Sequence, residues 1–590
     1  MTRETKICQN CKQEFTIEPE DFLFYQKIEV PAPTFCPDCR LQRRLSLANI
    51  FHLYKRICDL CKKASISRYS PEKPYIVYCP KCWWSDKWDA LSYGRDYDFS
   101  RPFFEQFDEL FREAPILGLS VDVQSANASP FVNDTGYVKN CYLIFTATES
   151  ENCMYGYFIA RSKDCADSSF IQQCELSYDL FHCLKVYNGI DSGYTLLSNN
   201  AAFLWQCSNC QDCFLSANLK NKQYYIFNKP HTREAYEKKI KEYDLGSYKA
   251  YIKLKEEARK HWLKFPVKTF WQEFSQDVSG LFVFQSKNCK NCFEVTGAQD
   301  CKYASFLITP TIRDSYDYTS WGNNAELVYD SHCVGEGVRN IKFGEETGIG
   351  CYDSDYVKLV TGGASNLFGC VGIKKKSYCI LNKQYTKTEY EKLEVKIIKH
   401  MNDMPYRDKA GRVYRYGEFF PIELSPFAYN ETLAQQYYPL GESKTKQKGY
   451  QWKDLQISEY KVTLGAKDLP DHICDASDSL VRETIGCLSC PRAFKITLQE
   501  LSLYRKMNVP LPRECFYCRL DEKLKDQPHP MRLYTRQCQC AGKRSINKIY
   551  ENQTAHFHKD DLCTNEFETS YAQDRPEIVY CKECYQAEVA

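Results

Sequence analysis

The stretch that decides the fold is residues 140–165, NCYLIFTATESENCMYGYFIARSKDC, in a chain of 590 residues. Cysteine recurs in it at a constant spacing, at Cys141, Cys153 and Cys165, and an Asn or Asp precedes each one. A period near 12 is too short for helical repeats and is typical of the coils of a β-solenoid, whose corners favour Asn and Asp. The stretch therefore predicts stacked coils in which cysteine takes the inward position.

Free cysteines at inward positions behave as small apolar groups, so the pattern indicates a ladder of buried thiols. Extra metal sites within the solenoid are the alternative interpretation. They would lie at the dense motifs that contain Cys207, Cys210, Cys213, Cys289 and Cys292.

The middle of the chain is duplicated. Residues 219–238, LKNKQYYIFNKPHTREAYEK, parallel residues 373–392, IKKKSYCILNKQYTKTEYEK, at an offset of 154. A helix is expected at the end of each half, and Thr386 with Glu389 forms a capping box for the second. A further helix is expected from about Ser247. We expect these helices to cover the open ends or edge strands of the solenoid.

The two ends of the chain are also copies of each other. Residues 8–44 read CQNCKQEFTIEPEDFLFYQKIEVPAPTFCPDCRLQRR, and they match residues 487–523 at a constant offset of 479 without a gap. The match extends beyond cysteine and includes Arg40 with Arg519. A second cysteine-containing unit follows each copy, so each end carries a tandem pair.

Two C-x-x-C pairs brought together by a hairpin present four thiolates, which suit a tetrahedral zinc ion. Such a site leaves no coordination position open and is therefore structural. We predict about four zinc ions, and the alternative interpretation of these cysteines is redox dithiols or an iron cluster. The predicted ligands are Cys8, Cys11, Cys36 and Cys39; Cys58, Cys61, Cys79 and Cys82; Cys487, Cys490, Cys515 and Cys518; and Cys538, Cys563, Cys581 and Cys584.

The fourth set departs from this pattern. Cys538 is followed by Cys540 instead of a cysteine at the usual spacing, and an insertion separates Cys538 from Cys563. The insertion carries His556 and His558. Cys540 or one of these histidines is a candidate substitute ligand, and the alternative interpretation is that the histidines are exposed loop residues.

Residues 8–44 resemble the small bacterial probable zinc-binding domain of zinc-ribbon type, in the C-x-x-C pair, the phenylalanine, the FY pair, the prolines and the C-x-x-C-R sequence. The whole chain resembles uncharacterised cysteine-rich zinc-ribbon proteins of candidate-phyla bacteria, which combine such ribbons with a repetitive middle. The resemblance implies zinc binding at the matching cysteines and implies no reaction.

The predicted fold class is mainly β with some α, with tandem zinc ribbons flanking a duplicated, cysteine-laddered β-solenoid that has covering helices. The expected domains are tandem zinc ribbons over 1–90, a linker helix over 91–118, a first solenoid half with helices over 119–265, a second half with a helix over 266–404, an irregular linking segment over 405–480 and a second pair of ribbons over 481–590.

Composition restricts the class of protein further. A content of 43% hydrophobic and 15% aromatic residues is that of a folded protein, and a net charge of +2 indicates no particular partner. No apolar run approaches the ~18 residues of a membrane span, and no signal peptide is evident. Many of the 33 cysteines lie in C-x-x-C pairs, which favours thiolate ligands in a reducing compartment. We expect a cytoplasmic protein with no membrane partner.

Two binding functions fit these features. The main hypothesis is a non-catalytic zinc-binding scaffold or interaction protein, whose ribbons and solenoid surface bind a macromolecular partner. The alternative is a nucleic-acid-binding zinc-ribbon protein. Its surplus of positive charge is small, since residues 1–90 contain 15 basic and 11 acidic residues. The candidate phosphate contacts are Arg40, Arg43, Arg44, Lys55 and Arg56.

A β-helix enzyme that acts on carbohydrates is the second alternative, because paired carboxylates on a solenoid face can cleave glycosidic bonds. The available carboxylates are Asp314, Asp317, Asp330, Asp353 and Asp355. Aspartate is also the expected corner residue of a solenoid, and no motif of a known catalytic constellation occurs in the sequence. We therefore expect no catalysis, and the sequence leaves open whether the partner is protein or nucleic acid.

Overall fold

The computed structural model describes residues 2–122, 125–269, 271–454, 460–525, 527–529 and 531–589. Within these residues the chain is mainly β with 12 α-helices, and a β-solenoid occupies the middle, as predicted. None of the helices in this part combines the length and the apolar character that a membrane crossing requires.

The chain divides into two compact units. Unit 1 contains residues 1–119 and 270–454, and unit 2 contains residues 120–269 and 455–590. Each unit therefore combines one solenoid half with the cysteine-rich segment from one end of the chain. The N-terminal segment belongs with the second solenoid half, and the C-terminal segment belongs with the first.

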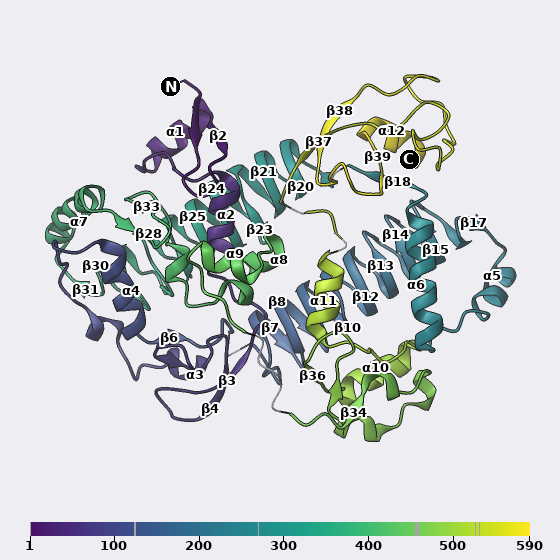
Figure 1. The fold of residues 1–590 in the computed structure, drawn as a ribbon, viewed down its shortest axis with the longest axis horizontal. Helices are drawn as coiled ribbons and strands as arrows, with labels where there is room; N and C mark the ends of the chain where they lie inside the picture. Colours follow the sequence, from purple (N-terminus) through teal and green to yellow (C-terminus); the bar gives the residue numbers. More distant parts are fainter. Residues whose placement is uncertain are drawn as a thin grey trace. The chain divides into compact units, whose positions relative to one another are not determined.

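In the first solenoid half, in unit 2, β7 to β16 form a parallel stack (Figure 1), and β17 pairs antiparallel with β16. The coils have the length of the cysteine repeat. Tyr142 pairs with Met154, and Lys163 pairs with Glu175. Its strands are β7 (Asn133–Lys139), β8 (Tyr142–Glu151), β9 (Met154–Ala160), β10 (Lys163–Ala166), β11 (Ser169–Gln172), β12 (Glu175–Leu184), β13 (Tyr187–Gly193), β14 (Asn199–Trp205), β15 (Gln211–Ala217), β16 (Gln223–Ile226) and β17 (Lys229–Pro230).

The second half, in unit 1, has coils of less regular length, from 11 residues between Gln276 and Lys287 to 14 residues between Ala298 and Ile312. Arg339 pairs with Tyr352, and Ala298 pairs with Ile312. Its strands are β19 (Gln272–Glu273), β20 (Gln276–Phe284), β21 (Lys287–Thr296), β22 (Ala298–Lys302), β23 (Ser305–Leu307), β24 (Ile312–Gly322), β25 (Ala325–Gly335), β26 (Arg339–Lys342), β27 (Glu345–Gly348), β28 (Tyr352–Asp355), β29 (Ser365–Phe368), β30 (Ser377–Ile380) and β31 (Lys383–Gln384).

The corners of the coils explain the Asn and Asp pattern. Asn140, Asn152 and Asp164 have φ of 54°, 55° and 52°, a left-handed conformation that Asn and Asp tolerate. Their side chains form a ladder, in which the amides of Asn140 and Asn152 each donate a 2.8 Å hydrogen bond to the next coil. Positive φ recurs at every third residue between Asn140 and Asn152, so this coil makes four such turns.

The cysteines point inward, as predicted. Cys141, Cys153 and Cys165 are at most 2% exposed and lie in one apolar core with the aliphatic side chains of neighbouring coils. The Cys153 thiol lies 3.4 Å from the carbonyl oxygens of Glu151 and Ser162. Burial raises the pKa of the Cys183 thiol to about 12, so this thiol is neutral and packs as an apolar group.

Helices accompany each half of the solenoid. The described helices outside the chain ends are α4 (Phe103–Glu113), α5 (Arg233–Ile240), α6 (Tyr248–Trp262), α7 (Lys387–Asp403), α8 (Leu433–Tyr437) and α9 (Glu442–Gln447). Ser247 caps α6, which packs on β14 and β15, and the predicted capping box of Thr386 and Glu389 starts α7. Tyr390 of α7 packs against Tyr378 in the last coil. α7 therefore covers the last coil, as expected, whereas α6 lies against inner coils and not at an open end or edge strand.

The cysteine-rich ends contain four modules: module 1 (residues 4–45), module 2 (54–83), module 3 (485–525) and module 4 (534–589). Modules 1 and 2 contain β1 (Glu4–Ile7), β2 (Glu14–Ile17), α1 (Pro19–Lys27), α2 (Pro37–Leu45), β3 (Tyr54–Ile57), β4 (Ala64–Ser67), β5 (Val77–Tyr78) and α3 (Pro80–Trp83). Modules 3 and 4 contain β35 (Ile485–Gly486), β36 (Ala493–Phe494), α10 (Leu498–Met507), α11 (Phe516–Lys525), β37 (Tyr534–Gln537), β38 (Glu566–Thr569), β39 (Ile578–Tyr580) and α12 (Lys582–Val589).

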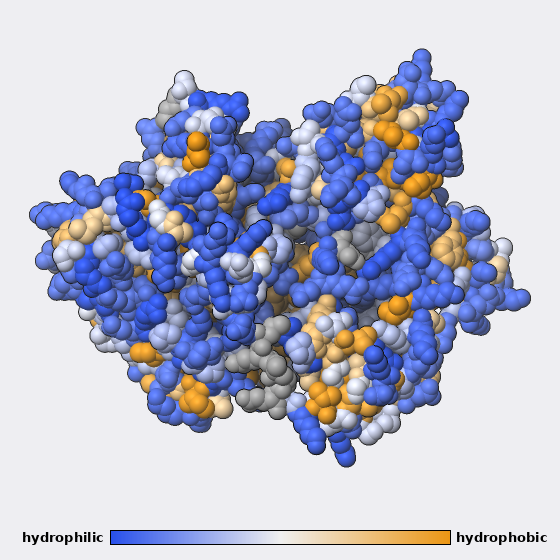
Figure 2. Space-filling view, in the orientation of Figure 1, coloured by the Kyte–Doolittle hydropathy of each residue, from blue (hydrophilic) through white to orange (hydrophobic). Residues whose placement is uncertain are grey.

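Apolar side chains reach the surface of unit 2 over α10 and over module 4 (Figure 2). The exposed large apolar residues of modules 3 and 4 are Leu488, Leu498, Ile546, Ile549, Phe557 and Leu562. Four of these six lie in the insertion that separates Cys538 from Cys563. The insertion therefore presents apolar surface as well as candidate metal ligands.

Candidate metal centres

Module 1 brings four cysteine sulfurs to one point. The turn between β1 and β2 carries Cys8 and Cys11, and α2 begins directly after Cys36, with Cys39 in its first turn. The sulfur atoms of these four residues lie within 4.8 Å of one another. A hairpin and a helix N-terminus therefore assemble the predicted ligand set.

The other three predicted sets are assembled in the same way, each with its sulfurs within 4.8 Å of one another. In all four modules the backbone N–H of the third cysteine donates a hydrogen bond to the sulfur of the first. The distances are 3.3 Å for Cys36 to Cys8, 3.2 Å for Cys79 to Cys58, 3.2 Å for Cys515 to Cys487 and 3.1 Å for Cys581 to Cys538.

The separations between the sulfurs fit a single tetrahedral metal ion. Metal–sulfur bonds of about 2.3 Å give a tetrahedron with sulfur–sulfur edges of about 3.8 Å. The sulfurs of Cys11 and Cys36 are 3.7 Å apart, and those of Cys563 and Cys581 are 3.9 Å apart. In module 3, Cys487 and Cys518 are separated by 3.8 Å. These four-cysteine groups could each hold one metal ion.

The solenoid cysteines do not form such groups. Among the described residues, every cluster of three or more candidate ligand atoms within 4.8 Å belongs to a cysteine module. Cys207, Cys210, Cys213, Cys289 and Cys292 lie buried along the solenoid core instead. The alternative of metal sites at these motifs is not supported, because successive thiols spread along the stack.

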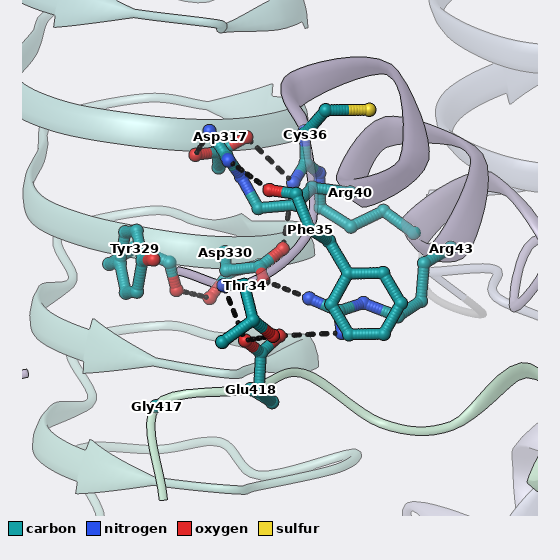
Figure 3. Close-up of polar contacts among 12 residues, drawn as sticks. Thr34, Phe35, Cys36, Arg40, Arg43, Asp317, Tyr329, Asp330, Gly417 and Glu418 are labelled. Carbon is teal, nitrogen blue, oxygen red and sulfur yellow. Dashed lines mark hydrogen bonds and ion pairs between the residues drawn. The ribbon is translucent and has the colours of Figure 1, made fainter. Parts of the chain in front are cut away.

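The basic residues of α2 lie inside unit 1 and pair with carboxylates of the solenoid (Figure 3). Arg40 Nη2 is 2.8 Å from Asp317 Oδ2. Arg44 Nη1 bridges Asp317 Oδ1 at 3.1 Å and Asp330 Oδ1 at 2.7 Å. Asp317 and Asp330 lie on the neighbouring strands β24 and β25, so α2 joins two coils.

Arg43 extends this network to the segment that follows α7. Its Nη2 is 2.7 Å from Asp330 Oδ2, and its Nη1 is 2.9 Å from Glu418 Oε2. Glu418 also accepts hydrogen bonds from the backbone N–H and the hydroxyl of Thr34, just before Cys36. Three arginines and three carboxylates thus balance in charge at a site where no side chain is more than 5% exposed.

Charge pairing holds the Arg40 guanidinium ionised in spite of burial. Loss of water alone would lower the pKa of the Arg40 guanidinium, but the Asp317 carboxylate beside it more than offsets this effect and raises the pKa. Arg40 also lies over the ring of Tyr303, at 5.3 Å from the ring centroid. The network is therefore a fixed structural joint between module 1 and its solenoid half.

This burial corrects part of the nucleic-acid prediction. Arg40, Arg43 and Arg44 are at most 1% exposed, so they cannot contact phosphates in the folded unit. Arg56 is half-buried and donates to the carbonyl oxygens of Ser70 and Tyr75. Of the five candidate contacts, only Lys55 is exposed.

Unit 2 repeats the joint with the matching helix. Arg519 Nε of α11 is 2.8 Å from Asp167 Oδ1, and Lys523 Nζ is 2.5 Å from Asp179 Oδ1. These two basic residues correspond to Arg40 and Arg44 at the offset of 479. The guanidinium of Arg519 lies 5.0 Å from the ring centroid of Tyr155, as Arg40 does over Tyr303.

The two joints differ in charge at one matched position. Arg43 corresponds to Glu522, whose side chain is 51% exposed and makes no comparable buried pair. In unit 2 a third aspartate, Asp191, follows Asp167 and Asp179 on the next coil, and we call these three residues the aspartate row. Lys255 of α6 lies 2.6 Å from Asp179 and 3.4 Å from Asp191. Burial raises the pKa of Asp191 to about 6, although Lys255 opposes the shift.

A cleft of about 500 Å³ opens beside this row, between the solenoid face, α6 and α11. The rings of Trp205 and Trp262 stack at 5.0 Å in its wall. Ile252 and Leu263 lie at the cleft with exposed side chains. The charged lining residues carry both signs, so the cleft combines aromatic surface with paired charges.

We predict that Asp330→Ala destabilises unit 1 by about 3–5 kcal/mol, because Arg43 and Arg44 then lose a buried partner. Urea unfolding monitored by circular dichroism measures the change. The control is Asp314→Ala, which breaks a 3.2 Å pair with Lys27 at the surface and should cost about 1 kcal/mol or less. Equal small effects of the two substitutions would contradict a structural role for the network.

No protein-family model matches the chain, and no curated protein matches it. Among solved structures, a crystal structure described as a putative acetyltransferase from Desulfovibrio desulfuricans G20 aligns with 49% of this chain and 86% of its own. The identity is 10% and the TM-score is 0.08, so the likeness carries no argument about fold or function.

Proposed function

We propose that this protein is a non-catalytic, zinc-stabilised scaffold that binds a protein partner. The observation that carries the proposal is the ion-pair network that joins a helix of a cysteine module to stacked aspartates of the solenoid. One such joint occurs in each unit. The joint uses the basic residues of the modules for internal packing and is sealed in unit 1, but it adjoins an open cleft in unit 2.

Zinc is the metal that we assign to the four-cysteine groups. Thiolate ligands at the observed sulfur–sulfur separations suit zinc, and four protein ligands leave no position for water or substrate. The hairpin followed by a helix that starts at a cysteine supports the assignment as zinc ribbons. A reducing compartment such as the cytoplasm suits these groups, since none of the 33 cysteines forms a disulfide bond.

The cleft of unit 2 is the partner site that we favour. Its volume is within the range of pockets that enclose a few side chains or a small ligand. Stacked tryptophans, exposed Ile252 and Leu263 and charges of both signs resemble the composition of protein interfaces. A phosphate backbone would favour a clear excess of positive charge, whereas this lining has seven basic and six acidic residues.

The alternatives have weaker support. Lys55, Lys62 and Lys63 remain exposed for a nucleic acid, but the arginines of α2 are buried. For a carbohydrate-active enzyme, Asp317 and Asp330 are enclosed under α2 and Asp355 pairs with Lys342, while Asp353 is exposed. A sugar could not reach the enclosed carboxylates without removal of α2.

We predict that Cys36→Ser removes one zinc ion per chain and unfolds module 1, because the metal's binding energy is also the folding energy of such a small module. Native mass spectrometry counts the zinc, and limited proteolysis reports the unfolding. Cys474→Ser is the control, since Cys474 is exposed and lies outside the groups. An unchanged zinc count, or zinc loss from an intact module, would contradict the zinc-ribbon assignment.

For partner binding, we predict that Ile252→Glu abolishes recovery of a specific protein with the full chain from an extract of its native cells. A carboxylate at the cleft would oppose burial of apolar surface there. Val395→Glu is the matched control on α7, where Val395 is 69% exposed. Retention of the partner by Ile252→Glu would contradict the cleft assignment. Recovery of nucleic acid, lost as salt is raised, would favour the alternative function.

A further inference from the structure

Module 4 contains two ligand groups that share one residue. Cys538, Cys563, Cys581 and Cys584 form the first group, with sulfurs within 4.8 Å of one another. A second group with the same spacing consists of Cys540, His556, His558 and the same Cys584. Cys540, His556 and His558 therefore do not substitute for a member of the first group but complete a second set of four.

The ligand atoms of the second group are spaced as around a metal ion. His558 Nε2 lies 3.3 Å from Cys584 Sγ, and His556 Nδ1 lies 3.5 Å from Cys540 Sγ. A tetrahedral ion with bonds of about 2.0 Å to nitrogen and 2.3 Å to sulfur places these atoms about 3.5 Å apart. The separations thus match those expected for ligands of one ion.

The outer nitrogen of each histidine has a hydrogen-bond acceptor. His558 Nδ1 lies 2.7 Å from the carbonyl oxygen of Asp561, which can only accept, so this nitrogen carries the proton. His556 Nε2 lies 2.9 Å from Glu588 Oε1, with both side chains fully buried. Each inner nitrogen then directs a lone pair at the sulfurs, which is the orientation that second-shell acceptors give to metal-binding histidines.

Amide groups also point at the sulfurs. Asn552 Nδ2 lies 3.1 Å from Cys540 Sγ, and Asn565 Nδ2 lies 3.4 Å from Cys581 Sγ. Donors of this kind stabilise sulfur that carries negative charge. All five cysteines are at most 2% exposed, so their thiolates would require compensation by cations.

We propose that module 4 holds two zinc-class divalent ions bridged by the thiolate of Cys584, one bound by four cysteines and the other by two cysteines and two histidines. Two ions of charge +2 and five thiolates leave a net charge of −1, which is less than the −2 of a lone four-cysteine site. The second ion would hold the insertion, which has no helix or strand between β37 and β38 in the described residues.

Among the described residues, two ligand groups that share a cysteine occur in module 4 alone. Module 2, its duplicate, has Cys58, Cys61, Cys79 and Cys82 but no counterpart of the insertion. The inference concerns this metal cluster alone and does not depend on partner binding. With single ions in modules 1 to 3, it raises the expected number per chain from four to five.

Native mass spectrometry of the full chain, purified without chelator, tests the count. We expect five zinc ions in the wild type, four in His558→Ala, and five again in His558→Cys, because a thiolate can replace the imidazole. His231→Ala, which alters a histidine outside both groups, should retain five. Four ions in the wild type would overturn the proposal, because the second ion would then be absent. Five ions in His558→Ala would also overturn it, because the fifth ion would then not be bound by His558.

Cadmium-113 NMR of the wild-type chain, with cadmium in place of zinc, tests the bridge without changing any residue. Two of the cadmium resonances should be split by coupling to each other through the shared sulfur. Five resonances without mutual coupling would overturn the bridge. Four uncoupled resonances would overturn the second ion while supporting the four-cysteine sites, and so separate this inference from the zinc-ribbon assignment.

Discussion

Both units depend on neutralisation of buried aspartates that stack on successive coils of the solenoid. Two carboxylates on neighbouring strands lose water and repel each other unless cations reach them. The cations come from the helix that begins at the third cysteine of a module. Arg40 and Arg44 lie one and two helical turns after Cys36, so they share one helix face and reach both carboxylates. The four-cysteine group, the helix and the solenoid face are therefore coupled.

Duplication accounts for the repetition of this joint and also for its divergence. Cys515, Arg519 and Lys523 repeat the spacing on α11, and their partners are again aspartates on successive coils. Each cysteine segment belongs to the same compact unit as the more distant solenoid half in the sequence. One joint is closed by Arg43 and Glu418, while the other has an exposed glutamate at the matching position and a cleft beside it. One copy could thus keep the structural role while the other gained an open cleft.

The sequence predicted the solenoid, its inward thiols and the four cysteine groups, because each leaves a periodic or duplicated pattern. The cysteine period equals one coil, and the offset of 479 aligns entire modules. Burial of Arg40 could not be predicted, since basic residues beside a C-x-x-C pair are usually exposed. Its carboxylate partner, Asp317, also lies in the other half of the chain. The match of Arg40 with Arg519 was a usable signal of a shared structural role, because the two copies have the same charge at this position as well as the same cysteines.

Module 4 shows a different limit. Cys540, His556 and His558 were recognised as candidate ligands, but spacing alone assigned them as substitutes in one site. Only the fold shows that Cys584 is within reach of both groups. Long insertions separate ligands by distances that carry no geometric information, in contrast to C-x-x-C pairs, where the spacing itself fixes the geometry.

The central claim is that a folded cysteine module is required to stabilise the stacked aspartates of its solenoid half. Hydrogen–deuterium exchange of Cys36→Ser, compared with the wild type, tests it directly. The account predicts loss of protection in β24 and β25, which carry Asp317 and Asp330, while β10 to β13 of unit 2 keep theirs as an internal reference. Unchanged protection in β24 and β25 despite an unfolded module 1 would contradict the account.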